Sequence, residues 1–373
     1  MARKQFLSFL LIFSLLISYA SALAEADDDD DWDDNVDDAW EMEHPLHSGD
    51  YAYALLDDGT VEITSYGGAD TEIVIPDTLD GKPVTAIGER AFYYSLSLTS
   101  VTIPDSVTHI SQKAFSCCFQ LTSITLPSGL TAIESGTFDL CKSLTTIDIP
   151  DSVAAIADDA FIGCKALQSF TLSPNHPYFF LADDALCRTA DSTLLLYPNA
   201  REPRTYRIPD GITAISAYAF YDCDLLESVV VPDSVTQLPA RAFSGCSALA
   251  SVSLPDSLTE IGTAAFSGCS ALTGIRIPAA ITEIINHTFS GCTSLATLEI
   301  PDSVTKIGDY AFFGCTSLTS IAIPDSVTAI GNGAFSNCTA LTLTVTPDSY
   351  AAEYAKANNI PYTYPDANDW LNN

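Results

Sequence analysis

Basic residues are scarce in this sequence. Lys and Arg together number 15 against 48 Asp and Glu, so the formal net charge at pH 7 is -33. Proteins that bind DNA or RNA through its phosphates need clustered Lys and Arg, and an acidic surface repels those phosphates. The charge balance therefore excludes nucleic acid as a partner.

Long hydrophobic runs are also missing beyond the amino-terminal segment, so no membrane span is expected after signal cleavage. The one apolar run, residues 6–17, follows Arg3 and Lys4 and precedes small residues at 22–24 that are typical of a signal-peptidase site. We predict a signal peptide over residues 1–24 and a secreted, extracellular or cell-surface chain. A buried N-terminal helix is the alternative.

Catalytic motifs are absent as well. The sequence contains no glycine-rich phosphate loop after a strand and no Gly-x-Ser-x-Gly elbow. The histidines occupy unrelated positions: His44, His47, His109, His176 and His287. The sequence thus predicts that the protein is not an enzyme and has no catalytic residue, no cofactor and no metal site.

What the sequence has is a 23-residue repeat built around Ile-Pro-Asp-Ser-Val. The anchoring prolines are Pro104, Pro127, Pro150, Pro209, Pro232, Pro255, Pro278, Pro301, Pro324 and Pro347. Self-similarity with such a period is the signature of a solenoid, in which each repeat forms one coil. One coil cannot cover its own apolar residues, so its neighbours supply the rest of the core.

The same apolar slots recur in each coil. Eleven residues after the proline stands Phe115, Phe138, Phe161, Phe220, Phe243, Phe266, Phe289, Phe312 or Phe335, with Phe92 in an earlier coil. Stacking brings equal slots together, so we expect a phenylalanine column in the core beside similar columns of Ile and Leu.

Most of the eleven cysteines also follow the repeat. Fourteen residues after the proline stands Cys118, Cys141, Cys164, Cys223, Cys246, Cys269, Cys292, Cys315 or Cys338. Cysteine is often buried as a small hydrophobe, and parallel side chains in register rarely reach disulfide geometry. We predict free buried thiols, with disulfides between coils as the alternative. The lack of a Cys-x-x-Cys pair argues against zinc.

A strand is expected just before each repeat proline, as in residues 121–126, and these strands should pair in parallel along the stack. The following Asp and Ser suit a turn that bonds the local backbone, and glycine at the next corner, as in Gly308, lets the chain bend back. The Ala-Phe segment should make a short helical turn. The aspartates that follow the prolines form a column. They either stabilise this turn or bind calcium.

The elements Ile-Pro-Asp-Ser-Val, Ile-Gly and Ala-Phe-x-Gly-Cys resemble the BspA-like, Treponema-type class of bacterial leucine-rich repeats. The resemblance implies a leucine-rich-repeat solenoid of about ten to eleven 23-residue coils with a parallel β-sheet on one face. It also implies a hairpin cap at the N-terminus, a short helical cap at the C-terminus, and a secreted or surface-displayed binding protein, since similar proteins include adhesins for host proteins.

The repeat also suggests where the parts of the chain begin and end. Residues 25–43 hold nine Asp and three Glu with no base, and such blocks are usually disordered. In the last coil, Thr344 and Thr346 stand where other coils have aliphatic residues. We expect an acidic linker at 25–47, a hairpin cap at 48–75, the solenoid at 76–346 with an island insertion at 174–208, and a C-terminal cap at 347–373 with a helix over 349–359.

The outward positions of the strands are mostly small and polar, so few side chains can distinguish a partner. The distinctive ones are Arg207, Arg276, Glu299 and Asp148 on the strands, and Tyr178, Phe179 and Tyr197 in the island. The island aromatics either pack on the stack or anchor a ligand. Such a face favours weak or extended protein contact, since it lacks the aromatic anchors of tight interfaces.

We therefore predict a monomeric, non-enzymatic protein that mediates protein contact or adhesion through the strand face of the solenoid. The alternatives are a carbohydrate-binding or enzyme-associated module, which would have a glycan as its partner, and a passive surface-coat or spacer protein without a specific ligand.

Overall fold

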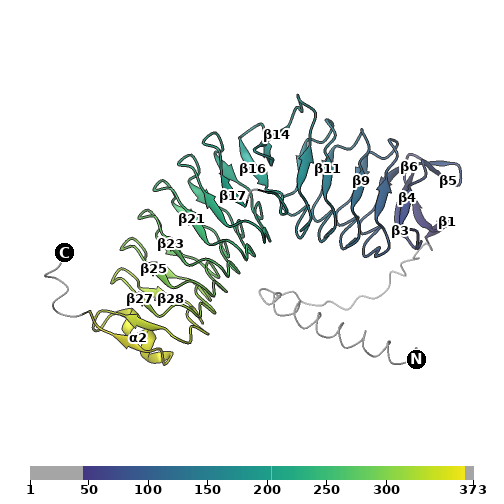
Figure 1. Cartoon of the computed structure of the whole chain (residues 1–373). Coiled ribbons are helices and arrows are strands. Elements are labelled where there is room, and N and C mark those ends of the chain that lie inside the picture. The colour runs from purple at the N-terminus through teal and green to yellow at the C-terminus, as the bar shows by residue number, and fades with distance from the viewer. Residues whose placement is uncertain (1–44, 203, 366–373) are drawn as a thin grey trace, which may run out of the picture. The chain divides into compact units, whose positions relative to one another are not determined.

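A computed structural model describes residues 45–202 and 204–365. The signal peptide predicted at 1–24 and most of the acidic linker predicted at 25–47 lie outside the described residues, as does the end of the predicted C-terminal cap. The described chain is a solenoid whose coils follow one another along the array (Figure 1). The predicted repeat fold with parallel sheets is confirmed.

The strand before each repeat proline belongs to a first ladder, in which equal slots pair in parallel register, as in Val229 with Val252. The middle residue of each strand points into the core and its neighbours point outward, because side chains alternate along a strand. The strands are β4 (Glu72–Val74), β7 (Ser100–Thr102), β9 (Ser123–Thr125), β11 (Thr146–Asp148), β13 (Ser169–Thr171), β17 (Thr205–Arg207), β19 (Ser228–Val230), β21 (Ser251–Ser253), β23 (Gly274–Arg276), β25 (Thr297–Glu299), β27 (Ser320–Ala322) and β29 (Thr342–Thr344).

A second ladder, which we did not expect, follows the turn after each proline. Its short strands end on the buried aliphatic slot six residues after the proline and pair in parallel, as in Ile307 with Ile330. The strands are β6 (Lys82–Ile87), β8 (His109–Ile110), β10 (Ala132–Ile133), β12 (Ala155–Ile156), β18 (Ala214–Ile215), β20 (Gln237–Leu238), β22 (Glu260–Ile261), β24 (Glu283–Ile284), β26 (Lys306–Ile307) and β28 (Ala329–Ile330).

The Ala-Phe segment, where we expected one short helical turn, closes each coil through consecutive tight turns. The Cys246 N–H donates back to Phe243 O, while the Phe243 and Gly245 N–H groups donate to carbonyls of the next coil at 2.9 and 2.7 Å. Gly245 has a φ of 80°, a left-handed conformation that glycine adopts without strain. We call this side of the solenoid the turn face.

The corner glycine serves close packing between coils. Gly308 lacks a left-handed φ, but a Cβ on it would lie 2.6 Å from the Asn286 main-chain nitrogen in the preceding coil. The Pro-Asp-Ser turn also reaches the preceding coil, because Ser303 Oγ donates to Ile281 O at 2.6 Å. Both features differ from the local turn roles that we expected, and both tie successive coils together.

The phenylalanine column forms the centre of the core. Phe266 stacks on Phe243 and Phe289 with ring centroids 5.5 and 5.7 Å apart and ring planes within 3°. Tyr66 stacks on the first ring of the column, Phe92, and Tyr354 packs edge-on against the last, Phe335. Aromatic rings from outside the repeats thus cover both ends of the column, as terminal caps must.

The N-terminal cap contains the expected hairpin, β2 (Tyr51–Leu55) with β3 (Val61–Tyr66), and adds a third antiparallel strand, β1 (Leu46–Ser48), to form a meander. The meander begins at Leu46, inside the segment that we expected to be linker. The β3 strand pairs in parallel with β6, which in turn pairs with the short β5 (Thr78–Leu79). The cap therefore continues directly into the second ladder.

The island is likewise a meander, of β14 (Phe179–Ala182), β15 (Ala185–Arg188) and β16 (Thr193–Leu196). The β16 strand pairs in parallel with β18, Leu194 lying beside Ile215. The insertion thus supplies one strand of the second ladder and does not merely project from the stack.

At the C-terminus, Ile321 pairs with Leu343 and Ala322 with Thr344, so this step is 22 residues. Thr344 consequently points outward, and Leu343 and Val345 fill the apolar slots, which corrects our assignment of Thr344 and Thr346 to core positions. The expected helix is α2 (Tyr350–Ala357), whose N-cap Ser349 accepts a hydrogen bond from Ala352 N. The short β30 (Tyr362–Thr363) pairs with β29. Among the described residues, no helix could cross a membrane.

Candidate functional site

The strand face contains a groove over β17, β19, β21 and β23. The last residues of these strands form one outward row, Arg207, Val230, Ser253 and Arg276, in which the two arginines flank two shorter side chains. The groove lies between the arginines and encloses about 570 Å³. Val231, Leu254 and the repeat prolines Pro232 and Pro255 also line it. The change from long to short side chains along an otherwise regular row therefore creates the groove.

Each arginine of the groove already has a carboxylate partner. Arg207 Nη2 lies 3.3 Å from Asp210 Oδ1, and Arg276 Nη1 lies 2.5 Å from Asp256 Oδ1. The hydrogen bond that Arg276 donates to Asp256 raises the pKa of Arg276. All four side chains are well exposed, and such surface ion pairs contribute little and separate readily. The groove can thus offer guanidinium donors and carboxylate acceptors to a partner without breaking the fold.

Glu299 and Asp148 have different surroundings. Glu299 is exposed and lies directly beside Arg276 in the parallel register of β23 and β25, so it extends the charged row past the groove. Asp148 lies on β11, before the island, and accepts a hydrogen bond from Thr171 Oγ1 at 2.9 Å. The structure therefore brings Arg207, Arg276 and Glu299 into one region and leaves Asp148 apart.

Two of the three island aromatics cannot contact a partner. Phe179 and Tyr197 are only 2% and 1% exposed, so these side chains pack on the stack and do not belong to the candidate binding surface. Tyr197 stacks on Phe220 at 5.2 Å and fills a slot of the phenylalanine column. Its position 23 residues before Phe220 is the signal that we missed. Tyr178 remains available, at 44% exposed.

The column of aspartates after the prolines takes part in contacts between coils. Asp105 Oδ1 accepts from Ser128 N in the next coil at 2.9 Å, and Asp151 Oδ1 accepts from Ser173 Oγ at 2.6 Å. Within residues 45–202 and 204–365, no group of three or more His, Cys, Asp or Glu side chains is placed to hold a metal ion.

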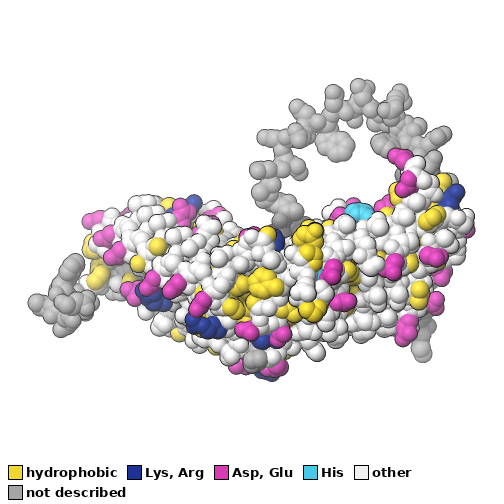
Figure 2. Space-filling model, turned by 90° about the horizontal axis from the view of Figure 1, so that it is seen from above, with side chains coloured by type: hydrophobic (Ala, Val, Ile, Leu, Met, Phe, Trp, Pro, Cys, Tyr) yellow, Lys and Arg dark blue, Asp and Glu magenta, His cyan; other side chains and the backbone are white. Residues whose placement is uncertain are grey.

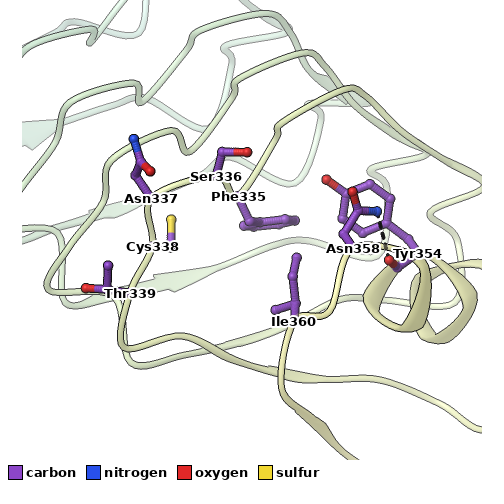
Figure 3. A pocket seen from close by; sticks show the side chains of 8 residues that line it. All are labelled: Phe335, Ser336, Asn337, Cys338, Thr339, Tyr354, Asn358 and Ile360. Carbon is purple, nitrogen blue, oxygen red and sulfur yellow. Dashed lines mark hydrogen bonds between the residues drawn. The ribbon is translucent and has the colours of Figure 1, made fainter.

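A second cavity, of about 300 Å³, lies where α2 meets the last coil (Figure 3). It is lined by Phe335, Cys338, Tyr354 and Ile360, among others. Cys338 is the one column cysteine with partial exposure. Its Sγ donates to Phe312 O at 3.0 Å. The interaction of its thiol with that of Cys315 in the preceding coil lowers the pKa of Cys338 and raises that of Cys315. The cavity exists because the helix covers the end of the column less closely than another coil would.

The surface charge agrees with the composition. Figure 2 shows Asp and Glu side chains spread over the face that is seen from above, with fewer Lys and Arg and with hydrophobic side chains gathered near the middle. On the turn face, Tyr93 and Tyr94 are both exposed, which we did not expect. The sequence signal was Tyr94, two residues after Phe92, where five later coils have glycine.

The ladders and the stacked core define a leucine-rich-repeat solenoid. Residues 71–181 and 208–343 match the model of the BspA type leucine rich repeat region, in six copies. The chain belongs to this family. No curated protein matches the chain.

Several solved bacterial structures are similar. A leucine rich cell surface protein from Faecalibacterium prausnitzii has 31% identity over 85% of this chain and 98% of its own, with a TM-score of 0.52. A leucine-rich repeat protein from Eubacterium ventriosum has 24% identity over 78% and 93%, with a TM-score of 0.60, and the pneumococcal vaccine antigen PcpA has 15% over 87% and 99%, with a TM-score of 0.55. The last two show the fold alone.

Proposed function

We propose that the protein is a secreted or cell-surface binding protein that performs no reaction and contacts a protein partner through the groove between Arg207 and Arg276. The observation that carries the proposal is the groove itself, because it concentrates the distinctive outward side chains on an otherwise small and polar face. The similarity to a leucine rich cell surface protein supports the location.

The chemistry of the groove suits a polar peptide segment. Its arginines can donate to a main chain, and the carboxylates of Asp210, Asp233 and Asp256 can accept from one. Leu254, which lines the groove and is partly exposed, can contact a small apolar side chain. Interfaces of this composition depend on electrostatic complementarity for their specificity. Contact at this site is therefore expected to weaken as salt concentration rises.

The test begins with the immobilised chain, which is used to capture proteins from bacterial and host extracts. Captured proteins are then measured by surface plasmon resonance against Arg207→Ala/Arg276→Ala and against the charge exchange Arg276→Glu/Glu299→Arg. Both variants should bind more weakly with an almost unchanged thermal midpoint, since exposed charges add little stability.

Arg188→Ala is the matched control, because Arg188 also forms an exposed ion pair, with Asp191, but lies in the island. It should bind as the parent does. Capture of no protein at all would favour the passive spacer instead. Binding that survives both groove variants but is lost in Tyr178→Ala would move the site to the island.

A further inference from the structure

An exposed aromatic cluster lies on the turn face of the first coils, away from the groove. Tyr93 and Tyr94 are each 49% exposed, and their ring centroids are 5.9 Å apart. Tyr94 packs edge-on against Phe119 of the next coil at 5.6 Å. Leu96 beside them is also exposed. Large apolar side chains gathered in this way on a soluble protein mark contact surfaces.

The backbone at Tyr94 indicates that the fold does not require this side chain. Tyr94 has a φ of 62°, and the equivalent position, two residues after the column phenylalanine, is left-handed in the other coils too. It is glycine in five of them and Cys117, Leu140, Asp222 or Asn337 in the rest. A left-handed conformation is unfavourable for a bulky residue and free for glycine. The fold therefore fixes the left-handed backbone of this slot and leaves its side chain free to vary between coils.

The structure already places a cation on this cluster. Lys142 Nζ lies 4.7 Å from the centroid of the Phe119 ring. Two other bases stand on these coils. Arg90 is paired with Glu89 at 3.6 Å, and Lys113, at the same slot of the next coil, lies near enough to Asp139 to act against the rise in its pKa. The face of an aromatic ring attracts cations, and a chain with a net charge of -33 draws positively charged segments toward it.

We propose that Tyr93 and Tyr94 form a docking site for an arginine-bearing segment of a partner protein, whose guanidinium groups stack on the two exposed rings beside the ring that Lys142 occupies. Arginine is preferred to lysine because its planar group stacks and is weakly hydrated. This site is separate from the strand-face groove and lies on another side of the coils. The proposal for either site can therefore be wrong without affecting the other.

The test measures binding of a fluorescein-labelled oligoarginine peptide to the full chain by fluorescence anisotropy, at several salt concentrations. Tyr93→Leu/Tyr94→Leu should weaken binding about fivefold or more, since two cation–ring contacts are lost. Tyr93→Phe/Tyr94→Phe should bind within about twofold of the parent because the ring faces remain. An oligolysine peptide of equal length should bind more weakly than oligoarginine.

Tyr350→Leu is the matched control, because Tyr350 is 48% exposed on α2, far along the chain from the cluster, and its loss should leave binding unchanged. The Arg207→Ala/Arg276→Ala variant should also bind the peptide normally. Tyr94→Gly, which relieves the left-handed backbone, should lose affinity without losing thermal stability and so separates binding from folding. Equal binding by the leucine variant and the parent would overturn the proposal, as would a neutral oligosaccharide that binds at these tyrosines while oligoarginine does not.

Discussion

Cys246 donates a hydrogen bond from Sγ to the main-chain oxygen of Phe220, 2.9 Å away in the preceding coil. The same bond joins Cys269 to Phe243 and Cys292 to Phe266, both at 3.1 Å. The cysteine column thus links each coil to the one before it, beside the stacked rings. Burial raises the pKa of Cys292 to about 12, so this thiol remains protonated.

The first prediction follows for thiol reactivity. All eleven cysteines lie among the described residues and are unpaired, and the column cysteines are buried except Cys338. A thiol probe should label native protein at Cys338 first, because it is partly exposed and its pKa is lowered. The others should react only after denaturation. Mass spectrometry of labelled peptides checks this, and native labelling of Cys269 as fast as Cys338, or disulfides between coils, would contradict it.

The second prediction concerns the phenylalanine column. Phe266→Ala should lower the free energy of unfolding by about 3 to 5 kcal/mol, because the stacked rings on both sides hold the cavity open. Phe335→Ala should cost less, since Tyr354 meets Phe335 edge-on at 6.3 Å and can move into the space. Phe92 lies between two stacked rings and should resemble Phe266. Chemical denaturation measures the losses, and equal values at Phe266 and Phe335 would argue against this account.

The third prediction tests the close approach at the coil corners. Gly308→Ala should destabilise the protein by about 1 to 3 kcal/mol, because its Cβ would press on the main chain of the preceding coil. Gly211→Ala is the control, since a Cβ there meets no atom within 4 Å, and it should change stability by less than about 0.5 kcal/mol. Thermal denaturation of both variants measures these losses. An equal loss of stability in the two variants would show that the corner is not tightly packed.

The fourth prediction concerns pH. The hydrogen bond from Arg188 lowers the pKa of Asp191 from 3.8 to about 2. Because the folded pKa is depressed, the small stabilisation from this pair is present above pH 4 and is lost as the pH falls toward 2. In Arg188→Ala, NMR titration should show the Asp191 pKa rising toward its ordinary value. An unchanged titration would mean that Arg188 does not hold the carboxylate in solution.

The regular part of the solenoid could be predicted because its repeat is nearly uniform. Phe266 and Cys246 each lie between the equivalent residues of the two neighbouring coils. The surroundings of each side chain therefore follow from the period alone. The parallel first ladder follows for the same reason, since equal spacing sets equal register. The second ladder was missed because its strands in the regular coils are only two residues long, as in β26, and lack a clear alternation.

The binding surface was predictable only in part. The sequence identified Arg207 and Arg276 as outward residues, but the groove depends on the shorter side chains between them and on ion pairs with aspartates of the turns. Such pairing is set by side-chain conformations at the surface, which the repeat does not constrain. The exposed pair on the turn face depends in the same way on the side chain at a variable slot of the repeat, that of Tyr94.

By itself, the sequence determined the solenoid, the stacked phenylalanines and the unpaired cysteine column, because an exact period makes each coil the neighbour of its own copy. The tertiary structure decided what happens where the period fails. It buried Tyr197 and Phe179 against the stack and turned Thr344 outward through a coil of 22 residues. At such breaks a residue's neighbours come from unrelated segments, so its exposure depends on packing that no repeat prescribes.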